Sequence, residues 1–295
     1  LLKSNDHSLF PRAIAGEYPS GSVIKPVFAA AALALGIITP QTQILSNGGI
    51  RIGKWFFPDW KAGGHGLVNV RRAISESVNT FFYALGGGYE EIKGLGLEGL
   101  HQAALAFGLS AKTGIDLPGE AEGFFPTAAW RLRTQGTPWR IGDTYHAAIG
   151  QGEVLVTPLQ ITNATAVIAN NGTLYRPHVV HSIIQADGRE MIVPRSVIRN
   201  DVSLTSALAE VRAGMREAVT SGSARGLNDL DLVIAGKTGT AQIGGTNKPH
   251  AWFTGFAPFE DPKIVLTVLV EEGGEGSSVA VPIAKEIFKA WQELY

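Results

Sequence analysis

The stretch LVIAGKTGT at residues 232–240 begins as a run of apolar residues and continues without a break into a cation and two hydroxyls. The apolar run is typical of a β-strand, and two further strand patterns follow closely at 251–256 and 264–270. Strands that succeed one another directly favour antiparallel pairing, because a parallel pair needs a long crossover connection. With a helical pattern at 281–294 after them, they predict an antiparallel sheet with helices on its faces.

The part of the chain that precedes these strands is mostly helical in pattern. A helix is expected to begin at about Ser22, a good cap or first-turn residue, and to run to Gly36 with apolar residues on nearly all sides. Such a helix is expected to be central and buried. Other expected elements are helices at 70–85, 97–107, 158–169 and 206–219, strands at 179–184 and 191–193 around an Asp187-Gly188 turn, a loop or short hairpin at 45–66, and irregular structure at 108–149.

The composition limits the classes of function. The chain has 295 residues, with 25 Lys and Arg against 26 Asp and Glu, 45% hydrophobic residues and no Cys. An even charge balance without a basic block argues against a nucleic-acid partner, since phosphate binding depends on clustered Lys and Arg. The lack of Cys excludes disulfides, thiol nucleophiles and Cys-ligated zinc.

The beginning of the sequence and its hydropathy indicate whether the chain carries a signal peptide or a membrane span. No signal peptide is visible, and the longest apolar run, residues 27–38, falls short of the roughly 20 residues that a bilayer span needs. The chain as given is therefore expected to be soluble. Because it begins at Leu1 rather than Met, we expect it to be the downstream part of a longer precursor whose anchor is left out.

A hydroxyl and an amine lie three residues apart, at Ser22 and Lys25, where the first buried helix is expected to begin. That spacing places both side chains on one face, one turn apart. The positive end of the helix dipole and the apolar neighbours both disfavour a charged ammonium on Lys25. A neutral lysine could then take the serine proton, which a hydroxyl nucleophile requires. Taken alone, the pair is equally compatible with a helix cap beside a lysine that extends to solvent.

A second polar cluster interrupts the helical pattern at 70–85. Ser77 and Asn79 supply a hydroxyl that could relay a proton and a carboxamide that could hold a substrate amide. A local cap or turn would also explain this pair.

A third cluster continues the strand pattern at 232–235. Lys237, Thr238 and Thr240 offer a cation and two hydroxyls that can hold a carboxylate, and Gly239 removes a side chain that would block a ligand lying along the backbone. A second Lys-Thr-Gly triplet at 112–114 follows a predicted helix rather than a strand, so we interpret it as a structural turn.

The three clusters in this order resemble the active-site motifs of the penicillin-recognising serine enzymes. The flanking sequence is most similar to class B penicillin-binding proteins, in particular the penicillin-binding protein 2 group, from about Leu9 to the C-terminus. The segments that carry this similarity are 18–22, 25–26, 64–66, 113–117, 150–152, 157–160 and 253–258. The resemblance implies an α/β (α+β) fold like that of penicillin-binding proteins and serine β-lactamases: one transpeptidase domain over 1–295, with a mostly helical lobe at about 26–170 and a sheet lobe at about 174–295. Relatives carry more sheet and further domains upstream of the serine, which again implies truncation.

The resemblance also implies a reaction, the D,D-transpeptidation that cross-links peptidoglycan. Ser22 would attack the carbonyl between two terminal D-alanines of a stem peptide, and Lys25 would act as general base. Ser77 and Lys237 would help to pass the proton to the leaving amine, while Asn79 would orient the donor peptide. An amine of a neighbouring stem peptide would then resolve the acyl-enzyme.

Substrate binding is implied for the remaining motif residues. Backbone N–H groups of Ser22 and Thr240 would form the oxyanion hole, and Thr238 and Thr240, with Gly239 between them, would hold the terminal carboxylate or that of a β-lactam. No cofactor is implied. The implied partners are stem peptides ending in D-Ala-D-Ala, β-lactam antibiotics and a membrane glycosyltransferase of the elongation machinery, and the implied location is the periplasmic face of the bacterial inner membrane.

Related activities use the same motifs. A β-lactamase needs a base that activates water, and the Glu-x-x-Leu-Asn pattern of class A enzymes is absent between Asn79 and Lys237. A D,D-carboxypeptidase uses water as acceptor and is not separated by motif. A non-catalytic penicillin sensor, acylated once, is the alternative from another class.

A metal site is the last feature that the resemblance raises. Asp59 and His65 match two positions that form part of a zinc site in some relatives. Val78 stands where a cysteine would be expected, and Ser46 where a further carboxylate would be. Two ligands are too few for a closed structural zinc site, so we expect no metal and a hydrogen-bonding role for the pair.

Overall fold

The computed structural model describes residues 8–244 and 248–294. Its central sheet consists of β11 (Ala235–Ala241), β12 (His250–Ala257) and β13 (Ile264–Val270) in that order. Both pairings are antiparallel, with Lys237 opposite Thr254 and Thr254 opposite Thr267. The predicted antiparallel sheet is confirmed, but its first strand begins at Ala235, and residues 232–234 of the apolar run precede it.

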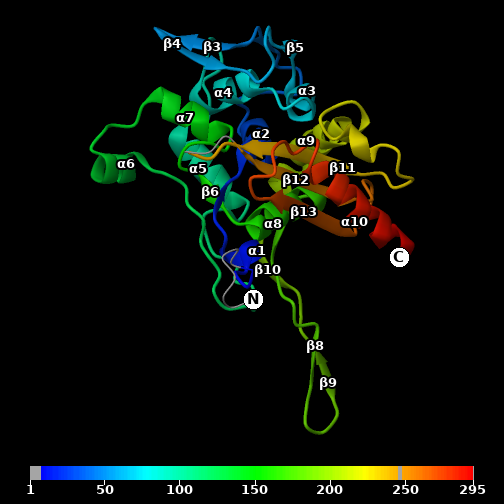
Figure 1. Ribbon diagram of the computed structural model, residues 1–295. Helices are drawn as coiled ribbons and strands as arrows, with labels where there is room; N and C mark the ends of the chain where they lie inside the picture. The colour runs from blue at the N-terminus through cyan, green and yellow to red at the C-terminus, as the bar shows by residue number, and fades with distance from the viewer. Residues whose placement is uncertain (1–7, 245–247, 295) are drawn as a thin grey trace.

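Alternate residues of β12 face two different cores. Trp252 and Phe256 belong to the large core, which contains α8 (Pro158–Ala169) and α9 (Thr205–Thr220). Phe253 belongs to a smaller core with Phe288 of α10 (Ala280–Leu294). The strand is therefore covered on both faces, and α10 lies across the sheet in Figure 1. This explains why all of β12 is buried although it is antiparallel.

The helix predicted from about Ser22 is confirmed, but its first turn is a 3-10 helix. A 3-10 helix, η1 (Gly21–Ile24), carries Ser22 and leads directly into α2 (Lys25–Ala34). Ser22 therefore caps nothing, and α2 begins at the lysine with Pro26 in its first turn, where a proline N–H would have no partner. Nearly all of α2 is buried, as its apolar pattern predicts.

The single helix predicted at 70–85 is two helices. α3 (Val70–Ser75) and α4 (Asn79–Gly87) are separated by a turn in which Ser77 has a φ of 60°. A non-glycine residue with positive φ cannot continue a right-handed helix. The apolar periodicity survives the break because Ala73, Ile74 and Phe81 all enter the same core.

The segment 108–149, expected to be mainly irregular, contains two helices. α6 (Ala128–Gln135) begins at Thr127, whose side chain accepts from the Trp130 N–H, and α7 (Ile141–Ala148) begins where the Asp143 carboxylate accepts from the Arg140 N–H. Both helices are short and start at a capping residue. The remaining helical segments are α1 (Arg12–Ala15), α5 (Gly96–Ala106), η2 (Val202–Leu204) and η3 (Arg225–Leu227).

Small two-stranded sheets surround the main body. The predicted hairpin around Asp187-Gly188 is present and projects from the body in Figure 1. The hairpin within 45–66 is also present, at the top of that view. The pairs are β1 (Tyr18–Pro19) with β6 (Leu155–Val156), β2 (Ile44–Ser46) with β5 (Gly66–Val68), β3 (Gly49–Ile52) with β4 (Trp55–Pro58), β7 (Thr173–Arg176) with β10 (Ser196–Asn200), and β8 (Ser182–Ile184) with β9 (Glu190–Ile192).

Residues of both predicted lobes belong to one core. Residues of α2, α4, α8 and β12 belong to the same buried cluster, and α8, which falls in the predicted helical lobe, packs on β12 and β13. The division at about residue 170 stays a prediction. Within 8–244 and 248–294, no helix combines the length and hydropathy that a bilayer crossing requires.

Candidate active site

Ser22 lies where η1 approaches β11. Gly21, with a φ of 51°, places its own Cα so close to the strand that a Cβ there would lie 2.8 Å from the Thr240 carbonyl oxygen. The Gly21 N–H donates to the Gly150 carbonyl at 2.8 Å. A glycine is needed at this position both for its φ and for the contact. The position of Ser22 is thus set by backbone contacts to two distant segments.

Lys25 is completely buried at the start of α2, three residues after Ser22. Its Nζ donates to the Ser77 carbonyl at 2.9 Å, to Ser77 Oγ at 3.3 Å and to Asn79 Oδ1 at 2.6 Å. Burial lowers the pKa of Lys25 to about 7, although the negative charge of Asp59 acts in the opposite direction. The amine is therefore close to half neutral near neutral pH, as a general base requires.

Lys237 is the second completely buried lysine. Its Nζ donates to the Thr238 carbonyl at 2.9 Å. Burial first, and the nearby Lys25 charge second, hold the pKa of Lys237 well below the ordinary lysine value. Two amines that repel each other in one buried site favour a state in which they do not both carry a proton.

The rest of the third motif lies along β11. Thr238 Oγ1 donates to Ser223 Oγ at 2.6 Å, while Thr240 is exposed and its Oγ1 accepts from the Gly276 N–H at 3.3 Å. A Cβ on Gly239 would lie 3.0 Å from Val23 Cγ1, so a larger residue there would press against η1. Gly239 also lines the cleft described below, and its role in leaving room for a ligand stays a prediction.

One cleft of about 620 Å³ joins these segments. Ser22, Ser77 and Asn79 line it from the helical side, and Thr238, Gly239 and Thr240 from β11. Lys25 and Lys237 lie buried behind its wall. The structure thus brings together all the residues that the three motifs predicted. The second Lys-Thr-Gly triplet at 112–114 lies in a non-helical segment, where Glu120 accepts from the Thr113 and Gly114 N–H groups, as expected of a structural turn.

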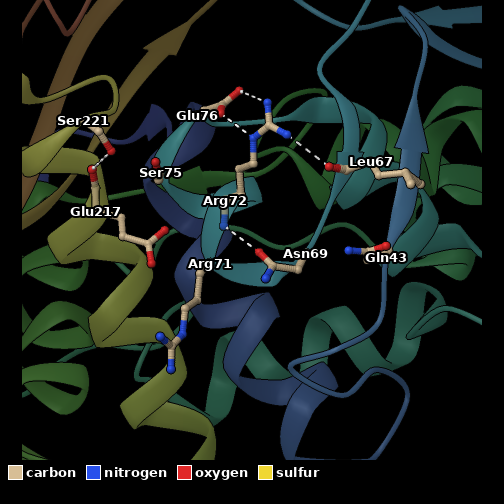
Figure 2. A pocket seen from close by; sticks show the side chains of 9 residues that line it. All are labelled: Gln43, Leu67, Asn69, Arg71, Arg72, Ser75, Glu76, Glu217 and Ser221. Atoms are coloured by element: carbon tan, nitrogen blue, oxygen red, sulfur yellow. Dashed lines mark hydrogen bonds and ion pairs between the residues drawn. The ribbon is translucent and has the colours of Figure 1, made fainter.

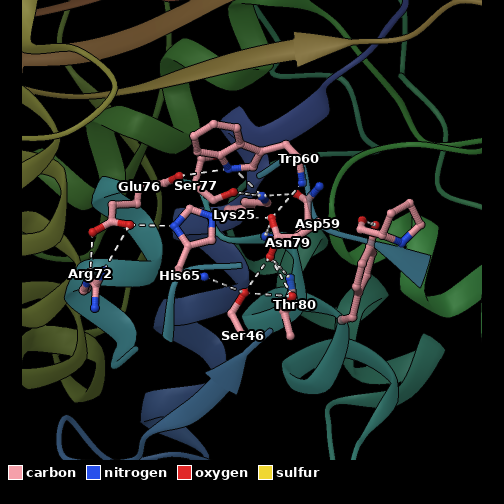
Figure 3. Close-up of polar contacts among 12 residues, drawn as sticks. Lys25, Ser46, Asp59, Trp60, His65, Arg72, Glu76, Ser77, Asn79 and Thr80 are labelled. Atoms are coloured by element: carbon pink, nitrogen blue, oxygen red, sulfur yellow. Dashed lines mark hydrogen bonds and ion pairs between the residues drawn. The ribbon is translucent and has the colours of Figure 1, made fainter. Parts of the chain in front are cut away.

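Asp59 lines the cleft and joins His65 in a hydrogen-bonded group (Figure 3). His65 Nδ1 pairs with Glu76 Oε2 at 2.6 Å, and its Nε2 lies 3.7 Å from Asp59 Oδ1. Burial raises the pKa of Asp59, but hydrogen bonds from Thr80 and Asn79 and the Lys25 charge outweigh it and lower that pKa below its usual value. The expected hydrogen-bonding role of Asp59 and His65 is therefore what the structure contains.

The residues at this position do not fit a zinc site. Zinc in a structural site takes four ligands, and Ser46 and Val78 offer neither a carboxylate nor a thiolate. Both Asp59 oxygens already accept hydrogen bonds, and His65 Nδ1 is engaged by Glu76. No group of three His, Cys, Asp or Glu side chains arranged for a metal occurs in the described part of the chain.

A second cavity of about 380 Å³ lies beside α3 and the end of α9 (Figure 2). Its charged groups are largely engaged with one another: Arg72 Nε donates to Glu76 Oε1 at 2.6 Å, and Arg71 Nε to Glu210 Oε2 at 2.6 Å. None of the residues that line it pairs a nucleophile with a base, so we place the chemistry in the larger cleft.

Sequence reasoning missed residues that support the motifs. Ser223 lines the cleft and accepts the Thr238 hydroxyl, and its own N–H donates to the Ser75 carbonyl at 3.2 Å. A Cβ on Gly222 would lie 2.4 Å from that carbonyl oxygen. The signal was the Ser-Gly-Ser run at 221–223, immediately after a predicted helix. Gln151 and Tyr83 also line the cleft.

Comparison with known proteins identifies the family. The model of the penicillin binding protein transpeptidase domain matches residues 3–289. The chain belongs to this family. The peptidoglycan D,D-transpeptidase MrdA of Acinetobacter baumannii is 35% identical to it over 98% of this chain and 45% of its own length. This member of the transpeptidase family therefore spans about half the length of the curated relatives that it matches.

Solved structures agree with this assignment. PBP2 of Pseudomonas aeruginosa, determined in complex with WCK 5153, is 34% identical with a TM-score of 0.87, covering 99% of this chain and 64% of that one. A chain from a structure described as "Structural coordination of polymerization and crosslinking by a peptidoglycan synthase complex" is 31% identical with a TM-score of 0.84, covering 100% and 49%. The predicted transpeptidase fold and the similarity to penicillin-binding protein 2 are confirmed.

Proposed function

We propose that this chain is the transpeptidase unit of a peptidoglycan D,D-transpeptidase. One observation carries the proposal: a buried Lys25, with a pKa lowered to about 7, hydrogen bonds to the Ser77 and Asn79 side chains next to a cleft that Ser22 also lines. This arrangement supplies a nucleophile, a base and a proton relay in one place.

The reaction begins when Ser22 Oγ attacks the carbonyl carbon of the bond between the two terminal D-alanines. Lys25 Nζ takes the hydroxyl proton, and the carbon–nitrogen bond breaks. The departing D-alanine amine receives a proton through Ser77 Oγ, which the Lys25 amine already contacts. We assign Lys237 a part in the same transfer, and the burial of Lys25, which disfavours its ammonium form, drives the return of the proton. The amine of a second stem peptide then attacks the ester carbonyl, the bond to Ser22 Oγ breaks, and the proton that the amine loses passes through Lys25 Nζ to Ser22 Oγ.

Substrate binding uses the two walls of the cleft. Because Asn79 Oδ1 accepts from Lys25, the amide nitrogen of Asn79 is the group that donates to the donor peptide. On the opposite wall Thr238 and Thr240 hold the terminal carboxylate, with Gly239 between them. The N–H groups of Ser22 and Thr240 form the oxyanion hole, where the loss of one donor costs roughly 2.7–4 kcal/mol.

The partners follow from this reaction. The substrates are stem peptides ending in D-Ala-D-Ala, and β-lactams acylate the same serine. The relative described in a peptidoglycan synthase complex that couples polymerization to crosslinking supports a membrane glycosyltransferase as partner of the whole protein. The site of action is the outer face of the bacterial inner membrane, where the peptidoglycan substrate lies.

Labelling with a fluorescent penicillin tests the proposal. The parent chain should form one covalent adduct and Ser22→Ala none, because the ester cannot form without the hydroxyl. Lys25→Ala should be acylated much more slowly than the parent, because the general base is removed. Its thermal melt should be unchanged, because the fold stays intact. Mass spectrometry of the adduct identifies the modified residue. An adduct that persists in Ser22→Ala at the parent rate would refute the assignment.

Turnover separates the related activities. Incubation with a D-Ala-D-Ala peptide and an amine acceptor should give D-alanine and the cross-linked product. Release of D-alanine without cross-linking would indicate a carboxypeptidase, and fast β-lactam hydrolysis a β-lactamase. Acylation that never turns over, with the upstream part of the protein restored, would indicate a sensor.

A further inference from the structure

The Asp59 carboxylate is at the centre of the hydrogen bonds in Figure 3. Its Oδ1 accepts from the Trp60 N–H at 2.8 Å and the Asn79 N–H at 3.1 Å. Its Oδ2 accepts from the Thr80 N–H at 2.9 Å, from Thr80 Oγ1 at 2.6 Å and from Ser46 Oγ at 3.1 Å. The side chain is 0% exposed. All of its hydrogen-bonding capacity is therefore directed at neighbouring protein groups.

Two of these donors are the first N–H groups of α4, which begins at Asn79. The first N–H groups of a helix have no partner within the helix, and Val78, at the cap position, provides no side-chain hydrogen bond. Asp59 therefore caps α4 from a separate segment, the one that follows β4. A negative charge at a helix N-terminus is also favoured by the helix dipole.

The turn that Asp59 holds is under strain and touches Lys25. Ser77 has a φ of 60°, which a serine adopts only when its surroundings impose it. The turn accepts three hydrogen bonds from Lys25 Nζ, and its Asn79 N–H donates to Asp59. Asp59 and Lys25 thus hold the same turn.

The group extends through Ser46 to His65. Ser46 Oγ accepts from the His65 N–H at 3.3 Å while it donates to Asp59, and Glu76 fixes the His65 ring through Nδ1. His65 Nε2 has no hydrogen-bond partner and faces Asp59 Oδ1. Ser46 Oγ therefore links the His65 backbone to the Asp59 carboxylate through hydrogen bonds.

We propose that Asp59 is a positioning residue for acylation, which holds the Ser77–Asn79 turn against Lys25 through hydrogen bonds and without a metal ion. The inference rests on the proposed function, because it is tested through the rate of acylation of Ser22. Asp59 acts through Asn79 and Thr80 rather than on the substrate.

The charges around the Lys25 amine make the proposal specific. Among the described residues, the charge of Asp59 on the segment after β4 acts on this amine, the amine in turn disfavours a charge on Lys237 of β11, and α4 presents the Phe82 ring at 5.1 Å. Glu76 and His65 lie beyond Asp59. Removal of the Asp59 charge should therefore favour the neutral amine, whereas entry of water through a loosened turn would favour the charged one.

The test uses the whole chain and the second-order rate constant of acylation by a fluorescent penicillin. Asp59→Asn should slow acylation at least about tenfold, because an amide nitrogen replaces an acceptor oxygen that faces N–H donors. The midpoint of its pH–rate profile should move to lower pH than in the parent. Asp187→Asn, at the exposed tip of the β8–β9 hairpin, removes the same charge far from the site and should match the parent.

A second pair of variants covers the case in which Asp59→Asn does not fold. Thr80→Val removes the hydroxyl that donates to Asp59 at 2.6 Å and keeps the shape of the side chain. It should slow acylation several-fold, and Thr80→Ser should restore most of the rate. Equal rates in Thr80→Val and Thr80→Ser, or a folded Asp59→Asn at the parent rate, would overturn the proposal.

The absence of a metal ion from the proposed role is tested with the unsubstituted chain. Zinc should not copurify in stoichiometric amount, and a chelator should leave both the thermal melt and the acylation rate unchanged. Stoichiometric zinc, or a rate lost on chelation and restored by zinc, would overturn the metal-free role. Ser22→Ala distinguishes failure of the proposed function from failure of this inference. A parent chain that forms no Ser22-dependent adduct would overturn both. The results described above for the Asp59 and Thr80 variants would overturn the inference alone.

Discussion

Lys25 couples the chemistry to pH through its burial. An ordinary lysine has a pKa of about 10.5 and is a poor base at neutral pH, because almost all of it is protonated. In this structure burial lowers the pKa to about 7, against the attraction of Asp59. Only the neutral amine can take the Ser22 proton. The fraction of active protein therefore grows as the pH rises through this pKa.

We therefore expect the rate constant of penicillin acylation to rise with pH, with a midpoint near 7, and to level off above it. Stopped-flow or quenched labelling across this range measures it. Lys25→Ala serves as control and should lack the rise. A parent rate that stays low until the pH approaches the ordinary lysine value of 10.5 would show that the amine is charged in the free chain.

At the level of elements, the contact between η1 and β11 fixes the nucleophile. Gly21 and Gly36 both have positive φ, but only at Gly21 would a Cβ meet other atoms, the nearest being Thr240 O at 2.8 Å. Alanine substitutions at these two positions therefore distinguish the effect of backbone strain from the effect of a steric contact with β11.

Gly21→Ala should lower the free energy of unfolding by about 1–3 kcal/mol and slow acylation strongly, because η1 must move away from β11 and carry Ser22 with it. Gly36→Ala introduces a similar strain of about 1–2 kcal/mol with no contact and should leave the acylation rate unchanged. Chemical denaturation and penicillin labelling measure the two effects. Equal acylation rates in both variants would contradict the role given to the contact.

Elements with long apolar patterns could be predicted from the sequence, and those defined by single residues could not. The patterns of α9, β12 and β13 extend over whole elements that face a core, and these were found. The break at Ser77 depends on one φ, which tertiary contacts from Lys25 and Asp59 impose. α7 depends on one Arg140–Asp143 cap within a segment that is rich in Gly, Pro and Trp.

The candidate site shows the same division. Ser22, Lys25, Asn79 and Lys237 were found because the spacing of their motifs resembles a known family. Asp59 as a cap of α4 could not be found, since the carboxylate and the helix are 20 residues apart and joined by folding alone. Burial of Lys25 was expected from its neighbours, but its hydrogen bonds to the Ser77–Asn79 turn depend on how α2 and α4 pack.

At the level of the whole molecule, two cores share β12. Phe288 of α10 is 0% exposed and lies against Phe253 with their rings 6.5 Å apart, on the face of the sheet opposite α2. This smaller core contributes to stability without contributing a residue to the cleft wall.

Phe288→Ala should therefore lower the free energy of unfolding by about 3–5 kcal/mol, as expected for a large aromatic side chain removed from a packed core. The acylation rate of the folded chain should change little, because β11 and η1 keep their contacts. Leu294→Ala on the same helix is the control, since Leu294 is 77% exposed. Denaturant titration followed by tryptophan fluorescence compares the two; a marked loss of acylation in folded Phe288→Ala would mean that the smaller core also supports the cleft.

The tip of the projecting β8–β9 hairpin is a suitable site for inserting additional sequence. Its two strands pair with each other, and at its tip a Cβ on Gly188 would touch nothing within 4 Å. Exposed loop tips of this kind accept inserted sequence with little loss of stability. A fluorophore or an epitope placed between Asp187 and Gly188 can therefore report where the protein sits in a living cell, at a distance from the chemistry it performs.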